Sequence, residues 1–153
     1  MQSRSSGFSL IELMLVLAIM AAATAAALPA MGRMYDAMQY RDSVRSLISS
    51  TKAARFKALS SGRSVDWVYR AGSREVLVSN KLQQTFNESF SIEVVSAKEL
   101  SDDSRRAVIR FYPDGSSSGG DIRLEHESGK GVQVKVDWLF GRISQHSLEE
   151  EFI

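Results

Sequence analysis

The sequence predicts an α+β fold in which a long N-terminal helix precedes an antiparallel β-sheet or sandwich head. Residues 8–31 are apolar at 20 of 24 positions, which favours a continuous helix. Apolar side chains then recur at three- and four-residue spacing from Val44 to Leu59. Beyond Gly62 the period changes to two, with glycine-rich turns about every ten residues. We therefore expect one helix over 8–60 and a β-rich head over 63–153.

The composition excludes several classes of protein. The 153-residue chain has no cysteine, which rules out a disulfide scaffold, a thiolate metal site and a cysteine nucleophile. Its length predicts a single hydrophobic core. The formal net charge of +1 argues against a domain that is strongly basic throughout.

The apolar segment 8–31 is long enough to cross a membrane. Its 24 helical residues would span about 36 Å, and the hydrocarbon core of a bilayer is about 30 Å thick. Glu12 lies inside the segment, although a carboxylate at membrane depth costs several kcal/mol and is usually partnered. A cleaved signal peptide, with Ala-x-Ala sites within 21–27, and a plain membrane anchor are the alternatives, but neither has a use for Glu12.

The run Gly7-Phe8-Ser9-Leu10-Ile11-Glu12-Leu13 resembles the class III signal of type IV pilins and type II secretion pseudopilins. The resemblance implies that a prepilin peptidase cuts after Gly7 and methylates the new amine of Phe8. Residues 1–7 would then be a leader, 8–31 a transmembrane and assembly helix, and 32–62 its periplasmic half. Glu12 would be the fifth residue of the mature chain and Pro29 the twenty-second, as in many family members.

The chemistry of Glu12 fits this resemblance. Cleavage would create an amine with a pKa of about 7.7–8, mostly cationic at neutral pH and one helical turn (about 6 Å) from the carboxylate. The amine could pair with Glu12 of its own chain or of a neighbouring subunit, which would favour the correct register in a filament. Pro29 removes one backbone donor, so we expect it either to loosen the helix or simply to mark the end of the membrane segment.

Two observations disagree about the orientation in the membrane. Three arginines, Arg33, Arg41 and Arg45, follow the apolar segment and only Arg4 precedes it, which by the positive-inside rule places the head in the cytoplasm. The resemblance implies a cytoplasmic leader and a periplasmic head. We follow the resemblance, because a leader that is read by a dedicated peptidase is the stronger signal.

Seven segments of the head have the composition of strands. They are residues 65–70, 75–79, 91–96, 107–112, 121–126, 131–138 and 141–144. In the sixth, the alternation predicts one buried face made of Val132, Val134, Val136 and Trp138. We expect a hairpin turn at 71–73, a loop at 81–90 that carries Phe86 into the core, and an exposed charged turn at 101–106.

The charges divide along the chain. Residues 33–63 carry seven basic and two acidic side chains, net +5, whereas residues 64–153 carry 11 basic and 15 acidic ones, net −4. An ordinary solvated surface explains this division. Complementarity between the acidic head of one subunit and the basic stem of another explains it as well, and would favour correct docking.

The segments 111–124 and 132–143 resemble the C-terminal pattern of the H-type minor pseudopilin family. The matching positions are Asp114, Gly115, Gly119, Gly120, Gly141 and Arg142. Pro113-Asp114-Gly115 has the composition of a turn, and a structural role is its default interpretation. The alternative is a contact surface for other tip subunits or cargo, formed by Asp114, Gly115, Gly119 and Gly120.

Other chemistry finds little support in the sequence. An EF-hand-like spacing is found at Asp114, Ser116, Ser118, Gly119 and Glu125. However, predicted strands flank this loop and serines replace the middle carboxylates, so we expect no metal site. No serine has a paired histidine, because His126 and His146 lie apart. We therefore expect neither catalysis nor a cofactor. DNA binding by the stem arginines would be opposed by the acidic run 149–151, so we expect no nucleic-acid partner.

The resemblance implies a minor pseudopilin of a type II protein secretion system. Such a subunit would lie at or near the pseudopilus tip, help to initiate the pseudopilus and support protein export across the outer membrane. Its partners would be the major and other minor pseudopilins in a hetero-oligomer, the prepilin peptidase, inner-membrane lipid, the secretin and exported proteins. The alternative is a minor type IV pilin, for pilus assembly, adhesion or DNA uptake.

Overall fold

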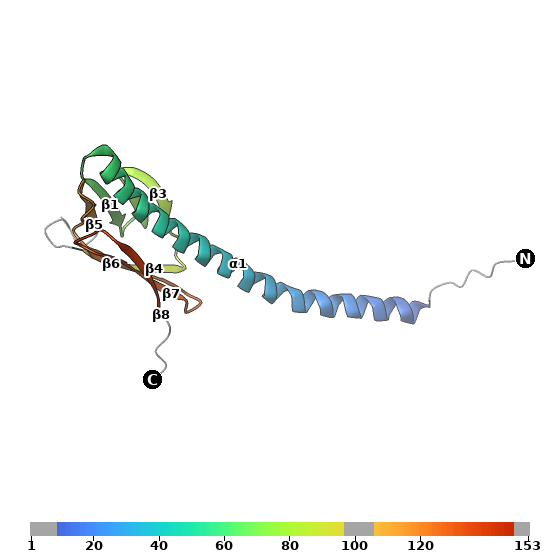
Figure 1. Ribbon diagram of the computed structural model, residues 1–153. Coiled ribbons are helices and arrows are strands. Elements are labelled where there is room, and N and C mark those ends of the chain that lie inside the picture. The colour runs from blue at the N-terminus through green and yellow to red at the C-terminus, as the bar shows by residue number, and fades with distance from the viewer. Residues whose placement is uncertain (1–8, 97–105, 149–153) are drawn as a thin grey trace, which may run out of the picture. The chain divides into compact units, whose positions relative to one another are not determined.

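The computed structural model describes residues 9–96 and 106–148, apart from the side chains of residues 26–31 and 33. One helix, α1 (Leu10–Ser61), comes first, and eight strands follow it in the described part of the chain (Figure 1). The strands are β1 (Val65–Arg70), β2 (Glu75–Val78), β3 (Lys81–Thr85), β4 (Phe90–Ser96), β5 (Arg106–Phe111), β6 (Gly120–His126), β7 (Gly131–Val136) and β8 (Ile143–Leu148). The predicted α+β fold, with its helix before antiparallel strands, is confirmed.

The helix α1 follows from its sequence. Its 52 residues begin with a run rich in leucine, methionine and alanine, which are strong helix formers. It continues without interruption through Pro29 and ends before Gly62, whose φ of +62° is the left-handed conformation common after a helix. The predicted stop at Gly62 is therefore confirmed.

The chain divides into two compact units, Met1–Gln39 and Tyr40–Ile153. In the first unit, the large apolar side chains of the described helix are exposed at every such position from Leu10 to Met20, and again at Met34 and Met38. No helix among residues 9–96 and 106–148 contains an 18-residue stretch apolar enough to count as a membrane-spanning segment.

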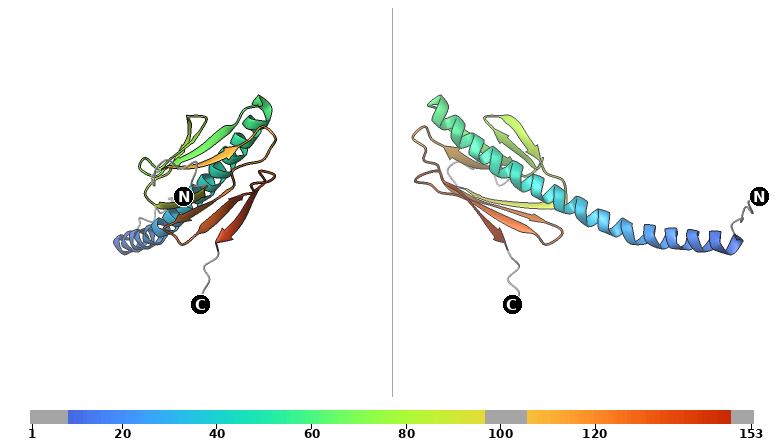
Figure 2. Two further views of the ribbon diagram at one scale, coloured as in Figure 1. Left: turned by 90° about the vertical axis from the view of Figure 1, so that its left-hand side faces the viewer. Right: turned by 45° about the vertical axis from the view of Figure 1, so that its right-hand side comes forward.

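The second unit holds two four-stranded antiparallel sheets. Their strand orders are β3-β2-β1-β5 and β4-β6-β7-β8. The first sheet pairs Trp67 with Val78 on one side and with Ile109 on the other, and the second pairs Ile122 with Val94 and with Val134. Within this unit the C-terminal part of α1 lies along both sheets, as the two views of Figure 2 show.

One hydrophobic core joins α1 and both sheets. The helix contributes its predicted stripe, of which Val44, Leu47, Thr51, Ala54 and Ala58 are buried. Both sheets contribute the inward side of their alternation, with fully buried side chains at Trp67, Ile109, Phe111, Ile122, Leu124 and Val134. Three further valine and leucine side chains, Val68, Leu77 and Val108, form a smaller cluster on the opposite face of the first sheet.

Several expectations about single segments are wrong. Trp138 is 66% exposed instead of buried, because β7 ends at Val136 and the strand alternation stops there. Leu59, expected in the core stripe of the helix, is 43% exposed. The segment 81–85 is a strand, since its backbone pairs with β2, although Phe86 is buried as expected. The last strand begins at Ile143, after Gly141 adopts a left-handed φ of +55°. Of the expected turn at 101–106, residues 101–105 lie outside the described residues.

Candidate functional site

The processing residues Gly7 and Phe8 lie outside the described residues. Glu12 is described, and it lies exposed in the first turn of α1 among exposed apolar neighbours such as Ile11 and Leu13. Its carboxylate forms no ion pair with another described residue. The described helix of the first unit therefore has an exposed apolar surface from Leu10 to Met20, with the carboxylate of Glu12 on it. A helix with apolar side chains on all sides is normally covered by lipid or by other helices.

Pro29 lies inside α1 and not at its end. Because proline has no N–H, the helix lacks one backbone hydrogen bond at this position, although the helix itself continues to Ser61. The helix was expected to run through Pro29, and it does. Whether Pro29 marks the end of the membrane segment stays a prediction. A loosened helix remains a prediction.

The candidate loop of the head begins with a tight turn after β5. The amide of Ser116 donates to Asp114 Oδ1 (2.9 Å), and the Ser116 hydroxyl donates to the same oxygen (2.6 Å). These hydrogen bonds hold the pKa of the exposed Asp114 carboxyl below its ordinary value. The Gly115 amide donates to the carbonyl of Tyr112 (3.0 Å), which closes the turn.

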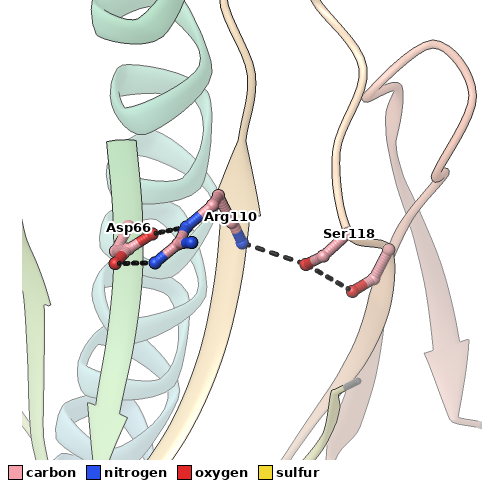
Figure 3. A network of polar contacts seen from close by, with 4 residues as sticks. Asp66, Arg110 and Ser118 are labelled. Atoms are coloured by element: carbon pink, nitrogen blue, oxygen red, sulfur yellow. Dashed lines mark hydrogen bonds and ion pairs between the residues drawn. The ribbon is translucent and has the colours of Figure 1, made fainter. Parts of the chain in front are cut away.

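An arginine on β5 ties this loop to the first sheet (Figure 3). Arg110 donates from Nε and Nη2 to the two carboxylate oxygens of Asp66 on β1, at 2.6 and 2.9 Å. This bidentate pairing, above all its hydrogen bond, raises the pKa of Arg110. The backbone of Arg110 also exchanges two hydrogen bonds with Ser118, donating to Oγ (3.0 Å) and accepting from its amide (2.8 Å). These hydrogen bonds attach the loop 112–119 to β5 at Ser118.

The loop glycines are packed against other backbone. A Cβ on Gly119 would lie 3.2 Å from the Cβ of Trp138, and one on Gly120 would lie 2.8 Å from the carbonyl oxygen of Val95. Gly115 and Gly119 are buried, so of the four predicted contact residues only Asp114 is exposed. This packing fits the structural interpretation of the motif, and a contact role for the loop remains a prediction.

Beside the loop lies a second turn, residues 137–142 between β7 and β8, where strands over 131–138 and 141–144 were expected; it is here called the aromatic turn. The Phe140 amide donates to Asp137 Oδ1 (2.8 Å), and the Asp137 amide donates to the carbonyl of Arg142 (2.9 Å). From the loop, the Ser117 amide donates to the carbonyl of Trp138 (2.9 Å). From α1, Arg55 Nη2 donates to the carbonyl of Phe140 (3.0 Å). The backbone of the turn is therefore fixed from three sides.

The aromatic turn presents three consecutive large apolar side chains to solvent. Trp138, Leu139 and Phe140 are all at least half exposed. An open cleft of about 510 Å³ lies next to them, lined by Lys52, Arg55, Phe56, Leu59, Phe140, Gly141, Arg142 and Ile143. One sequence signal could have indicated this site, the run of three apolar residues Trp138, Leu139 and Phe140. Consecutive residues of a strand point to opposite faces, so at least one of the three side chains would be exposed in a sheet with one buried face.

Gly141 is where the loop and the aromatic turn touch. Its φ is +55°, and a Cβ there would overlap the carbonyl oxygen of Gly115 and lie 3.1 Å from Arg55 Nε.

Gly141→Ala should therefore destabilise the chain by about 3 kcal/mol, from left-handed strain and steric overlap together. Thermal unfolding of the full-length chain in detergent, followed by circular dichroism, should show a Tm lower by about 6–12 °C. Gly72→Ala is the matched control, because nothing lies within 4 Å of its Cβ position; equal loss in both variants would contradict the packing argument.

The two histidines considered for metal or base chemistry lie on different strands, β6 and β8. Among residues 9–96 and 106–148, no three histidine, aspartate or glutamate side chains gather as metal ligands. His126 is buried, with its ring edge-on to Phe90 (centroids 4.8 Å apart) and to Tyr40 (6.4 Å). Its Nδ1 accepts a hydrogen bond from the Ser128 amide (3.2 Å). His146 lies exposed on β8, on a different strand.

Comparisons with known proteins match both ends of the chain. Residues 2–28 match the family model of the prokaryotic N-terminal methylation motif, and residues 43–139 match that of the type II transport protein GspH. The type II secretion system protein H of Xanthomonas campestris pv. campestris is 23% identical over 137 residues, 90% of this chain and 80% of that relative. The solved minor pseudopilin EpsH from the type 2 secretion system of Vibrio cholerae has the same fold, with a TM-score of 0.54 at 11% identity over 72% of this chain and 98% of EpsH.

Proposed function

Because the chain belongs to the family of the type II transport protein GspH, we propose that it works at or near the tip of a periplasmic pseudopilus, where it helps to initiate assembly. Membership makes the chain a minor pseudopilin of type II secretion, which assembles with other pseudopilins. It also favours secretion over the alternative of a minor type IV pilin. The proposal assigns the chain a structural part in protein export, and no turnover chemistry of its own.

One observation carries the assembly mechanism. The described apolar side chains of α1 from Leu10 to Met20 are all exposed, and the carboxylate of Glu12 lies among them in the first turn. A helix of this kind is stable only when lipid or other helices cover it. Stored in the inner membrane and then packed among other pseudopilin helices, it would stay covered throughout assembly. Glu12 would then pair with the N-terminal amine created by processing.

The remaining parts of the proposal follow from the same arrangement. The prepilin peptidase would act on the leader 1–7 at the cytoplasmic face, and the head from residue 63 onward would lie in the periplasm. Residues 8–31 would form the single membrane pass, since 20 of these 24 residues are apolar. Contacts with the secretin and with exported proteins would be made by the head.

Intact mass spectrometry of the chain extracted from membranes tests the processing step. We expect the mass of residues 8–153 plus one methyl group, because the peptidase would cut after Gly7 and methylate the amine of Phe8. Gly7→Leu should retain the full leader and the unmethylated mass, since the residue before the cut would be lost. A cut anywhere in 21–30 would show an ordinary signal peptide and would falsify the proposal.

A further inference from the structure

We propose that the aromatic turn and the cleft beside it form a docking site for an acidic segment, bearing apolar side chains, of a neighbouring pseudopilin of another type. The proposal rests on the proposed function, because it takes its partner from the pseudopilus. This site differs from the predicted contact loop. The residues that would touch the partner lie on α1 and on the turn between β7 and β8, and the loop 112–119 only holds the backbone of that turn, through the hydrogen bond from Ser117 to Trp138.

The apolar half of the site has the properties of a binding anchor. Trp138 and Phe140 are 66% and 63% exposed, and Phe56 on the neighbouring face of α1 is 72% exposed. Exposed aromatic side chains gathered at one place mark interaction sites more often than they mark free surface. Phe56 and Phe140 line the same cleft, so the helix and the turn each present an aromatic side chain to it.

The turn is also held ready for a partner before binding. Its backbone receives hydrogen bonds from the loop at Trp138 and from Arg55 at Phe140. Gly141 packs directly against the backbone of the loop, with no room for a side chain. A partner therefore need not order the backbone when it binds, and little of the binding free energy is lost to that cost.

The charged half of the site indicates what the partner carries. Three cations, Lys52, Arg55 and Arg142, line the cleft. None of them forms an ion pair with a carboxylate among residues 9–96 and 106–148, where the ion pairs involve Arg70, Arg110 and Arg123. Arg55 Nε is buried without a hydrogen-bond partner in this part of the chain. The nearby carboxylate of Asp137 accepts the hydrogen bond from the Phe140 amide.

Charge complementarity therefore favours an acidic segment. Residues 33–63, which supply Lys52 and Arg55, are net +5. An acidic segment of a neighbouring pseudopilin would meet a basic surface here. Its carboxylates would pair with the three cations, and its apolar side chains would cover Phe56 and the aromatic turn.

Photo-crosslinking in cells that express the complete set of pseudopilins tests this site. The full-length chain would carry p-benzoylphenylalanine at position 140, or at position 82 as a control. Leu82 on β3 is 55% exposed and lies outside the cleft. We expect an adduct with a different pseudopilin from position 140 and at least tenfold less from position 82. An adduct of position 140 with a second copy of this chain, with an exported protein or with the secretin would overturn the proposal.

Charge variants test the acidic partner. The double variant Lys52→Glu and Arg142→Glu should lower the adduct from position 140 at least tenfold, because both cations are exposed and would now repel carboxylates. Lys81→Glu and Lys135→Glu form the matched control, with two exposed lysines on β3 and β7 outside the cleft, and should leave the adduct unchanged. Equal effects of both pairs would remove the cleft from the interface.

Co-purification of the unlabelled chain with the other pseudopilins separates the two levels of the argument. If the chain co-purifies but position 140 gives no adduct, the docking site is wrong and the proposed function stands. If the chain does not co-purify with any pseudopilin, the proposed function fails, and the docking site fails with it.

Discussion

Replacing Glu12 with alanine is expected to reduce incorporation of the full-length chain into pseudopili at least tenfold, which corresponds to about 1.4 kcal/mol or more. In an apolar environment the carboxylate would be paired with a cationic N-terminal amine, and alanine would leave that amine without a partner. The head should stay folded, because Glu12 forms no ion pair with the described residues and lies in the other compact unit.

Quantifying the chain in purified pseudopili relative to the membrane pool measures this effect. Glu12→Asp should restore part of the incorporation, since it keeps the charge on a shorter side chain. Glu88→Ala, which removes an exposed carboxylate from the head, is the matched control and should have no effect. Wild-type incorporation of Glu12→Ala with an intact methylated N-terminus would show that the pairing does not drive assembly.

Trp67→Ala is expected to lower the free energy of unfolding of the second unit by about 3–5 kcal/mol. The indole of Trp67 is fully buried at the centre of the core, and its Nε1 donates to Ser50 Oγ on α1 (3.2 Å). Alanine would leave a large cavity between the first sheet and the helix and a buried hydroxyl without its donor. The loss should exceed that of any substitution at an exposed position of the head.

The second tryptophan of the chain provides the matched control. Trp138→Ala should change the free energy of unfolding by no more than about 0.5 kcal/mol, because that side chain is mostly exposed. Chemical unfolding of the two full-length variants in detergent, followed by near-ultraviolet circular dichroism, would compare them. Similar losses in both variants would mean that Trp138 belongs to the core and would also weaken the docking site built on it.

The periodic segments could be predicted from the sequence because their patterns repeat over many residues. The helix was predicted over 8–60 and runs over 10–61, and its stripe from Val44 to Ala58 is buried as expected. Six of the seven predicted strands lie within two residues of an observed one at each end, among them β1 and β6. In these segments each local preference agrees with the final fold, so the pattern alone is sufficient.

Short polar segments and strand ends could not be predicted, because their conformation depends on distant partners. Residues 81–85 form a strand only because β2 offers an edge to pair with. The strand ending at Val136 gives way to a turn because Ser117 and Arg55 hold the backbone of that turn, from about 20 and 85 residues away in sequence. The exposure of Trp138 follows from those contacts.

Residue order alone predicts the apolar helical segment that carries Glu12, the alternating strands of the head and the family of the chain. These features depend only on the order of the residues, because the periodicities of helices and strands set which side chains share a face, whatever packs against that face. The fold alone shows that the loop glycines are packing positions and that the aromatic turn is exposed beside a basic cleft. Both features depend on backbone groups that come together from α1, the loop 112–119 and the turn after β7, and no local pattern in the sequence connects these segments.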